Sequence, residues 1–363
     1  MTPVTDALPT AISADALARH FGVSLEAAQL VRDADLIDLH IDAFIPPRLP
    51  LVRYDLMRRH GTGCLGGRFF GHLDFPRIID AGLTGAMWSI TTNPFRRASR
   101  RFLVFQRNLA RFRALVDATD GRFRIVRNPA EYRAARAAGA HAVMVSIQGG
   151  NALDAAPGGL DAVPDHPVTR VTLVHLTNAA MGITSSPFKL WKGKRGLTDV
   201  GRAYIAMLNR HRVFLDLAHI NRAGFWDAVA AHDKTQPFLA THTGVTGVKP
   251  HWRNLDDRQV KAVADSGGVV GIIFSRAFLK TKKTPNDAGM ILDHMEHVIR
   301  VGGEDAVAIG SDYDGAIVPP KDLRSGDSYV RLVQKMLDRS WSEARIRKVL
   351  GLNFLASFER LRG

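Results

Sequence analysis

Short apolar segments recur along the chain and alternate with longer segments of helical periodicity. The apolar segments are rich in Val, Ile and Leu, as in strands buried on both faces of a parallel sheet; they are Leu36–Ile41, Leu83–Ile90, Ala142–Ile147, Val171–Leu176, Val213–Leu217, Phe238–Thr241, Val269–Phe274 and Val307–Ser311. Helical patterns fall between several of them, over Arg97–Ala118, Pro129–Ala138, Thr198–Arg210, Ala223–Ala231, Asp256–Asp265 and Asp287–Val301. This alternation predicts an α/β protein whose parallel sheet closes into a (β/α)8 TIM barrel.

Two short helical patterns precede the first strand. They resemble the start of a DNA-binding helix-turn-helix, with Gly22 in the turn and Ser24 as the N-cap of the second helix. The chain then runs directly into the strand at Leu36 and leaves no room for a third helix. We therefore predict a helical lead-in over residues 1–35 and one catalytic barrel over residues 36–363.

Length and composition fit one large barrel. The chain has 363 residues, of which 46% are hydrophobic, and Cys64 is its only cysteine, which excludes an intrachain disulfide and a cysteine-rich zinc site. No apolar run approaches the roughly eighteen residues of a membrane helix. The first thirty residues contain Asp6, Asp15 and Glu26 and do not resemble a signal peptide. These features predict a cytoplasmic protein with no membrane partner.

The formal net charge of +14 raises the question of nucleic-acid binding. The basic residues, however, do not form one block interleaved with aromatic residues; they are spread over Arg97–Arg113, Lys189–Arg195, Lys280–Lys283 and Arg339–Lys348. A dispersed basic surface predicts no nucleic-acid partner. The excess of cations still suits anionic ligands.

Polar side chains of one chemical kind stand at or just past the ends of the predicted strands. Reactive groups of such barrels sit at the carboxyl ends of the strands. Four of the fourteen histidines fall there, and the full set is His40, Asp42, Gln148, His175, His219, His242 and Asp312. In an extended strand, residues two apart face the same side, so His40 and Asp42 project together. Imidazole and carboxylate groups that converge in this way predict a divalent-metal site.

The sequences around these residues resemble the membrane dipeptidase (renal dipeptidase, peptidase M19) family of the amidohydrolase superfamily. Similar stretches occur in order over residues 33–360; they include Ile37–Asp42, Asp74–Arg77, Val171–Asn178, Leu215–His219, Thr241–Thr243, Ile309–Gly315 and Leu350–Phe354. The resemblance implies a metal-dependent hydrolase that cleaves the amide bond of a dipeptide or modified dipeptide. It also implies a small peptide as the binding partner, and it leaves a homodimer open.

The same resemblance implies the ligands of the metal. His40 and Asp42 would bind one zinc ion, and His219 and His242 would bind a second. Asp312 would act as the proton shuttle, taking a proton from the metal-bound hydroxide and returning it to the leaving amine. Two dications would lower the pKa of the water between them and polarise the amide carbonyl.

Three further residues are implied to contact the substrate. His175 would donate a hydrogen bond to the oxyanion that forms on the attacked carbonyl. Arg253, with its neighbour Asn254, would hold the terminal carboxylate of the dipeptide, because a guanidinium pairs with a carboxylate through two hydrogen bonds.

One position departs from the family pattern. Where the family has a Glu that bridges both metal ions, this chain has Gln148, in the stretch Ser146-Ile147-Gln148-Gly149. An amide carries no charge and offers one good ligand oxygen, so two close dications lose part of their compensation. Three outcomes follow: one metal ion with hydrolysis, two weakly bound ions with Gln148 as a ligand, or a protein on the same barrel that binds a peptide-like ligand with no hydrolysis or with an altered reaction.

Overall fold

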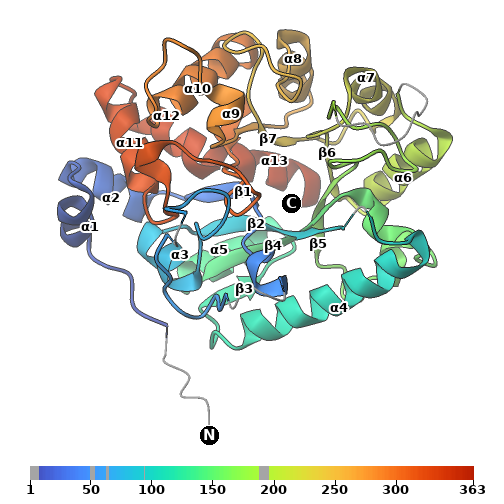
Figure 1. Ribbon diagram of the computed structural model, residues 1–363, viewed down its shortest axis with the longest axis horizontal. Helices are drawn as coiled ribbons and strands as arrows, with labels where there is room; N and C mark the ends of the chain where they lie inside the picture. The colour runs from blue at the N-terminus through green and yellow to red at the C-terminus, as the bar shows by residue number, and fades with distance from the viewer. Residues whose placement is uncertain (1–7, 50–53, 63–64, 94, 188–195) are drawn as a thin grey trace, which may run out of the picture.

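The structure, a computed structural model, describes residues 8–49, 54–62, 65–93, 95–187 and 196–363 (Figure 1). Cys64 and the basic segment over residues 189–195 lie outside the described residues.

Eight parallel strands form the barrel, in the hydrogen-bonded order β6-β5-β4-β2-β1-β9-β8-β7. Their bounds are β1 Ile37–Ile41, β2 Gly85–Thr91, β4 His141–Gln148, β5 Val168–Thr172, β6 Phe214–Asp216, β7 Ala240–Thr243, β8 Val270–Ile272 and β9 Val307–Ile309. The segment that leads into β7 closes the barrel against β6. There Leu239 N donates to Leu215 O at 2.9 Å and Leu239 O accepts from Leu217 N at 2.8 Å. The predicted (β/α)8 barrel is confirmed.

Helices surround the strands (Figure 1). They are α3 Phe75–Ala81, α4 Ala98–Asp117, α5 Pro129–Ala137, α6 Asp199–Arg210, α7 Arg222–Ala231, α8 Asp257–Asp265, α9 Arg276–Leu279, α10 Gly289–Gly302, α11 Tyr329–Asp338, α12 Glu343–Arg347 and α13 Asn353–Arg362. Several of these helices begin at a polar N-cap residue. Asp256 and Gln259 form a capping box on α8, and Asn221 accepts from Gly224 N at the start of α7.

Two helices precede the barrel, α1 Ala14–Phe21 and α2 Leu25–Asp33. Gly22 ends α1 in the left-handed conformation and Ser24 caps α2, as the sequence predicts. Ser24 N also donates to Gln334 Oε1 on α11 at 2.7 Å, and α2 buries Ala27 and Val31 completely. The helix α2 therefore packs on the barrel, which agrees with a helical lead-in.

The structure differs from the prediction in the strand β3, the bounds of β5 and the C-terminal helices. A ninth strand, β3 Phe123–Ile125, pairs with the start of β4 outside the barrel. The fourth barrel strand, β5, begins three residues and ends four residues earlier than predicted. Between β4 and β5, where the sequence has no helical pattern, the chain forms two 3-10 turns, Gly150–Leu153 and Gly159–Ala162. The C-terminal helices α11, α12 and α13 are additions to the six predicted helical patterns.

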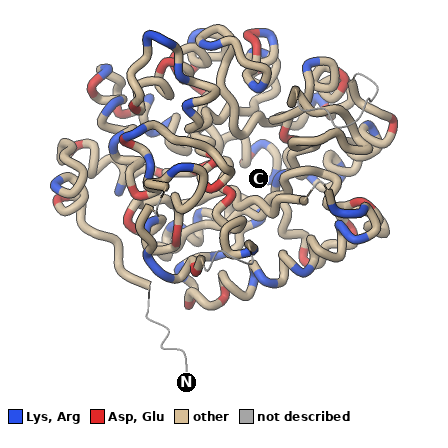
Figure 2. The backbone as a smooth tube through the Cα atoms, in the orientation of Figure 1, with Lys and Arg blue, Asp and Glu red and all other residues tan. Residues whose placement is uncertain are grey.

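Lys and Arg are distributed around the whole molecule (Figure 2). This agrees with the dispersed basic surface expected from the sequence. None of the described helices has the length and apolar character required to cross a bilayer.

Candidate metal centre

The carboxyl ends of the barrel strands bring the predicted metal ligands together. His40 lies inside β1 and Asp42 directly follows it, Gln148 is the last residue of β4, and His242 lies inside β7. His175, His219 and Asp312 each follow the ends of β5, β6 and β9 by three residues. Six of the seven residues are buried, and His175 is partly exposed.

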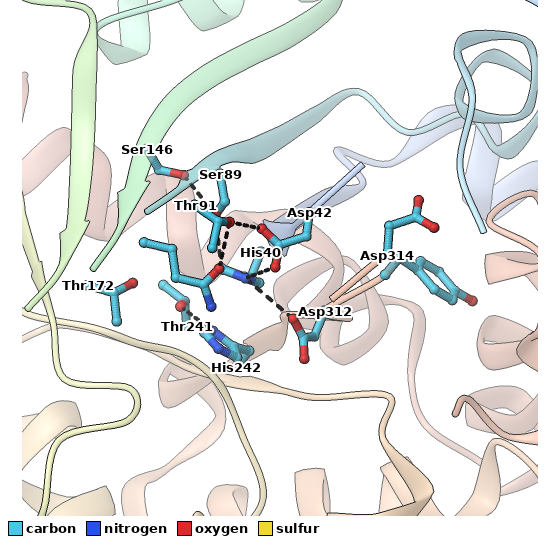
Figure 3. Close-up of polar contacts among 12 residues, drawn as sticks. His40, Asp42, Ser89, Thr91, Ser146, Thr172, Thr241, His242, Asp312 and Asp314 are labelled. Carbon is cyan, nitrogen blue, oxygen red and sulfur yellow. Dashed lines mark hydrogen bonds and ion pairs between the residues drawn. The ribbon is translucent and has the colours of Figure 1, made fainter. Parts of the chain in front are cut away.

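The ring nitrogens and carboxylates converge on one point (Figure 3). His40 Nε2 lies 3.4 Å from Asp312 Oδ1 and 3.6 Å from Asp42 Oδ2. His219 Nε2 and His242 Nε2 are 2.8 Å apart, and the rings of His40 and His242 stack at 3.8 Å between centroids. Among the described residues, His40, His242 and Asp312 offer ligand atoms that all lie within 4.8 Å of one another.

Hydrogen bonds through Thr241 and Asp216 fix the tautomer of His242. Thr241 Oγ1 donates to Asp216 Oδ2 at 2.7 Å, so its hydrogen is used and it accepts from His242 Nδ1 at 2.9 Å. The neutral ring then carries its proton on Nδ1 and directs the Nε2 lone pair into the cluster. This is the tautomer that a metal ligand requires.

His40 is held in the opposite tautomer. The Nη2 atom of Arg170, a fully buried arginine, donates to His40 Nδ1 at 2.8 Å. An arginine stays protonated, so the neutral His40 ring carries its proton on Nε2, which faces the carboxylates of Asp42 and Asp312. A cation that binds His40 through Nε2 must therefore displace this proton.

The two carboxylates of the cluster have opposite proton affinities. Burial raises the pKa of Asp42, but the nearby imidazole of His40 and the hydrogen bond from Thr91 outweigh it and the net pKa is lowered. Burial, and then the charge of Asp42, raise the pKa of Asp312 well above its usual range. Asp42 therefore suits a charged ligand and Asp312 suits a carrier of protons.

Gln148 acts as a hydrogen-bond donor to Asp42. With its amide nitrogen toward Asp42, it donates to Oδ1 at 3.1 Å and to Oδ2 at 3.0 Å, while its oxygen accepts from His175 Nε2 at 3.1 Å. Thr91 Oγ1 also donates to Asp42 Oδ1, at 2.6 Å. In this arrangement Gln148 presents N–H groups, not a lone pair, to the side of the site where Asp42 stands.

Two residues of the site have strained backbones. His219 and Asp312 both have φ in the left-handed region, at 70° and 62°. A Cβ at position 315 would lie 2.1 Å from Asp312 Oδ1, so only Gly315 leaves that carboxylate in place. Strain of this kind persists where the surrounding structure fixes a functional side chain.

The cluster lies at the base of a cavity of about 850 Å³. Arg253 lines this cavity; it is 3% exposed and donates to His242 O at 2.7 Å. Asn254 does not belong to the described lining. Its amide holds the loop together by accepting from Gly244 N and donating to the backbone oxygens of Lys249 and Phe278. Asn254 thus supports the loop that carries Arg253.

The donor set suits a divalent cation. Three imidazoles and two carboxylates converge from four strand ends, and His242 is already in the ligating tautomer. His219 Nδ1 is buried without a partner among the described residues, which leaves Nε2 as its only directed contact. The residues fit one ion on these grounds. A second ion would receive no compensating negative charge from Gln148.

The sequence did not point to the residues that orient the ligands. Arg170, Asp216 and Thr172 lie inside the barrel, where Thr172 Oγ1 donates to Asp216 Oδ2 at 2.6 Å and Arg170 Nη1 donates to the same oxygen at 3.2 Å. Polar residues at alternate positions of β5 were the available signal. Their burial becomes intelligible only once β5 and β6 are paired.

A (β/α)8 barrel with buried His and Asp residues at the carboxyl ends of its strands defines a class, the metal-dependent hydrolases of this fold. Within the class, the sequence profile of the membrane dipeptidase family (peptidase family M19) matches residues 25–361, and the chain belongs to that family.

Known proteins similar to the chain are consistent with this family. A curated protein from Klebsiella pneumoniae, described as an uncharacterized protein in the pqqA 5′ region, is 36% identical over 163 residues, which are 44% of this chain and only 59% of that protein. The crystal structure of dipeptidase AC, a metallopeptidase of family M19, is 29% identical with a TM-score of 0.78 and covers 91% of this chain and 99% of its own. A metallopeptidase from Rhodobacter sphaeroides, liganded with a phosphinate mimic of the dipeptide L-Ala-D-Ala, is 27% identical with a TM-score of 0.76, covering 90% and 99%.

Proposed function

We propose that the protein hydrolyses the amide bond of a dipeptide or modified dipeptide with the help of a bound divalent metal ion, zinc being the ion expected from the resemblance. The observation that carries this proposal is the convergence of three imidazoles and two carboxylates at the base of a cavity large enough for a small peptide. The Rhodobacter sphaeroides neighbour, which holds a dipeptide mimic, supports the choice of substrate class.

His40, Asp42, His219 and His242 would hold the metal. When bound, the ion would polarise the amide carbonyl and lower the pKa of a water molecule toward neutrality. Asp42 would supply the charge, because its pKa is lowered and it stays ionised near pH 7. The relay from Asp216 through Thr241 keeps His242 ready to ligate.

Asp312 would move the proton. Burial raises the pKa of this carboxyl, so Asp312 would accept the proton that the attacking water gives up and would pass it to the leaving amine. Its strained backbone and the absence of a side chain at Gly315 fix its carboxylate beside His40.

His175 and Arg253 would position the substrate. Burial lowers the pKa of His175 to about 4, so the ring is neutral, and its Nε2–H already points at the oxygen of Gln148. That proton would serve a carbonyl oxygen that becomes negative. Arg253 would pair with the terminal carboxylate of the peptide, and burial strengthens such a pair because water competes less.

The hydrogen bond between Gln148 and Asp42 favours the second function, a non-hydrolytic protein that binds a peptide-like ligand. Metal content separates the two. Elemental analysis of zinc-dialysed protein, together with a dipeptide hydrolysis screen on the same sample, should show bound metal and turnover. Absence of both would leave the binding protein as the correct description.

A further inference from the structure

The cavity has a second group of cationic side chains, on the wall opposite Arg253. Four arginines contribute to this wall: Arg48 from the turn Pro46–Arg48, Arg96 from the segment before α4, and Arg101 and Arg111 from α4. Among the described lining residues, the only carboxylates are Asp42 and Asp312, which belong to the buried group of His and Asp side chains at the candidate metal centre.

One face of α4 builds most of this wall. Arg101, Val104, Asn108 and Arg111 all line the cavity and follow the three- and four-residue steps that place side chains on one side of a helix. The apolar face of α4, with Phe102, Phe105 and Phe112, packs on the barrel, and the neighbouring polar face lines the cavity. Arg101 is compensated, because its Nη1 pairs with Asp154 Oδ2 at 2.5 Å.

Arg111 differs from the other arginines of its helix. Arg113 Nη1 pairs with Asp165 Oδ2 at 2.8 Å, outside the cavity. In the part of the chain that the structure describes, the side chain of Arg111 makes no ion pair or hydrogen bond. Arg111 is an exposed residue of the cavity lining, and no carboxylate among the described residues pairs with its charge.

Arg48 lies within electrostatic reach of both Arg111 and the metal cluster. Its Nε donates to Phe44 O at 2.9 Å and its Nη1 to Thr91 O at 3.2 Å, so neutral backbone oxygens fix the guanidinium. Burial lowers the pKa of Arg48, the carboxylate of Asp42 raises it, and the charge of Arg111 lowers it further. Two cations on one cavity wall, neither of which forms an ion pair with a described carboxylate, suit the binding of an anion.

The topology places this site across the barrel from Arg253. The helix α4 follows β2, the second barrel strand, whereas Arg253 lies between β7, the sixth barrel strand, and α8. The second and sixth of eight strands are diametrically opposite, and Figure 1 shows α4 and α8 on opposite sides of the strands. A peptide whose terminal carboxylate contacts Arg253 therefore extends its other half toward Arg48 and Arg111.

We propose that Arg48 and Arg111 form an anion-binding subsite that selects peptides with an acidic side chain on the residue that supplies the scissile carbonyl. This inference rests on the proposed function for the direction of the peptide. The preferred substrate class is then a dipeptide with two carboxylates, one at Arg253 and one at the α4 wall.

The test compares L-Glu-L-Ala with L-Gln-L-Ala, which have nearly the same shape and differ in charge. We expect kcat/KM for L-Glu-L-Ala to be at least about tenfold higher, as for one charge-assisted hydrogen-bonded pair. The ratio should fall toward one in Arg111→Gln, and Arg111→Lys should keep part of it. The matched control Arg113→Gln, on the same helix, should keep the whole ratio.

Equilibrium binding of the same two peptides to metal-depleted protein separates this inference from the proposed function. Hydrolysis of both peptides with equal kcat/KM, or a ratio that Arg111→Gln leaves unchanged, overturns the inference and leaves the function standing. Tighter binding of L-Glu-L-Ala that Arg111→Gln abolishes, without hydrolysis by metal-loaded protein, supports the subsite and overturns the function. Neither binding nor hydrolysis overturns both.

Discussion

Gln148 and Asp42 face each other at the metal centre, with the amide nitrogen of Gln148 3.0 Å from Oδ2 of Asp42. A carboxylate at position 148 would repel Asp42 and attract a cation between them; the amide instead forms a hydrogen bond with Asp42. We therefore expect this pair to limit the number of metal ions that the site can hold.

Gln148→Glu should therefore increase the affinity for a second metal ion, by about ten- to a hundredfold, the range of changes in the surroundings of metal ligands. Turnover should increase with it, because a second ion adds charge at the reacting carbonyl. The measurement is metal content at several free-zinc concentrations, paired with hydrolysis rates. Gln148→Met, which also removes the hydrogen bond but adds no charge, is the matched control and should show neither gain. Unchanged metal content and activity in Gln148→Glu would show that the amide does not limit the site.

Asp312→Asn should reduce turnover at least about a hundredfold, because the amide cannot carry a proton between water and the leaving amine. Metal content should be retained, since the side-chain oxygen stays beside His40. Steady-state hydrolysis and elemental analysis of the same preparation check this. Asp305→Asn, at a carboxylate with 85% of its side chain exposed, is the control and should be indistinguishable from the unaltered protein. Activity of Asp312→Asn close to that of the unaltered protein would exclude Asp312 as the proton shuttle.

Arg253→Gln should raise KM for L-Ala-L-Ala about ten- to a hundredfold, which corresponds to the loss of hydrogen bonds to a charged group. L-alanyl-L-alaninamide lacks the terminal carboxylate, so its KM should rise far less in Arg253→Gln. The comparison of the two substrates isolates the pairing of Arg253 with the carboxylate. Arg258→Gln on α8 is the control, since Arg258 lies over the ring of Trp226, 5.4 Å from its centroid. Equal losses for both substrates would show that Arg253 acts through the loop and not through the carboxylate.

The stability of the fold should fall in mild acid because of His141. Its Nδ1–H donates to Leu83 O at 2.7 Å and its Nε2 accepts from Trp88 Nε1 at 3.0 Å, so a second ring proton would face a donor. Burial lowers the pKa of His141 from 6.5 to about 4. Between these values the unfolded chain binds a proton that the native chain does not, so the free energy of unfolding decreases as pH falls through that window.

The difference in pKa corresponds to about 3 kcal/mol for this residue. Denaturant unfolding at pH 7 and pH 4.5 measures it. His141→Gln, whose amide can accept from Trp88 and donate to Leu83, should flatten the dependence, whereas His20→Gln on the exposed side of α1 should not. An equally steep dependence in His141→Gln would show that other groups cause it.

The barrel could be predicted from the sequence because its strands are apolar on both faces and carry polar residues at one end. His40, Gln148, His219 and His242 follow this rule, and the structure brings them together. The strand β5 was misplaced because Arg170 and other polar residues inside it resemble surface positions. Arg170 can be buried because Asp216, which is far away in the sequence, compensates its charge and accepts a hydrogen bond from it.

The cavity wall could not be predicted. Helical spacing shows that Arg101 and Arg111 share a face of α4, but the packing of α4 on the barrel decides which face meets the cavity. The three-residue strand β3 has too short a pattern to be recognised. By contrast, the helix α11 has a clear signal in Tyr329, Val333 and Met336, at helical spacing and all fully buried.

The most direct test of the account is the metal content of zinc-dialysed protein, measured by elemental analysis and paired with dipeptide hydrolysis before and after chelation. We predict at least one tightly bound ion per chain, turnover that is lost on chelation, and recovery of turnover when zinc is restored. A protein that binds no metal, or one whose dipeptide hydrolysis survives complete removal of the metal, would contradict the assignment of the buried His and Asp cluster as the centre of a metal-dependent dipeptidase.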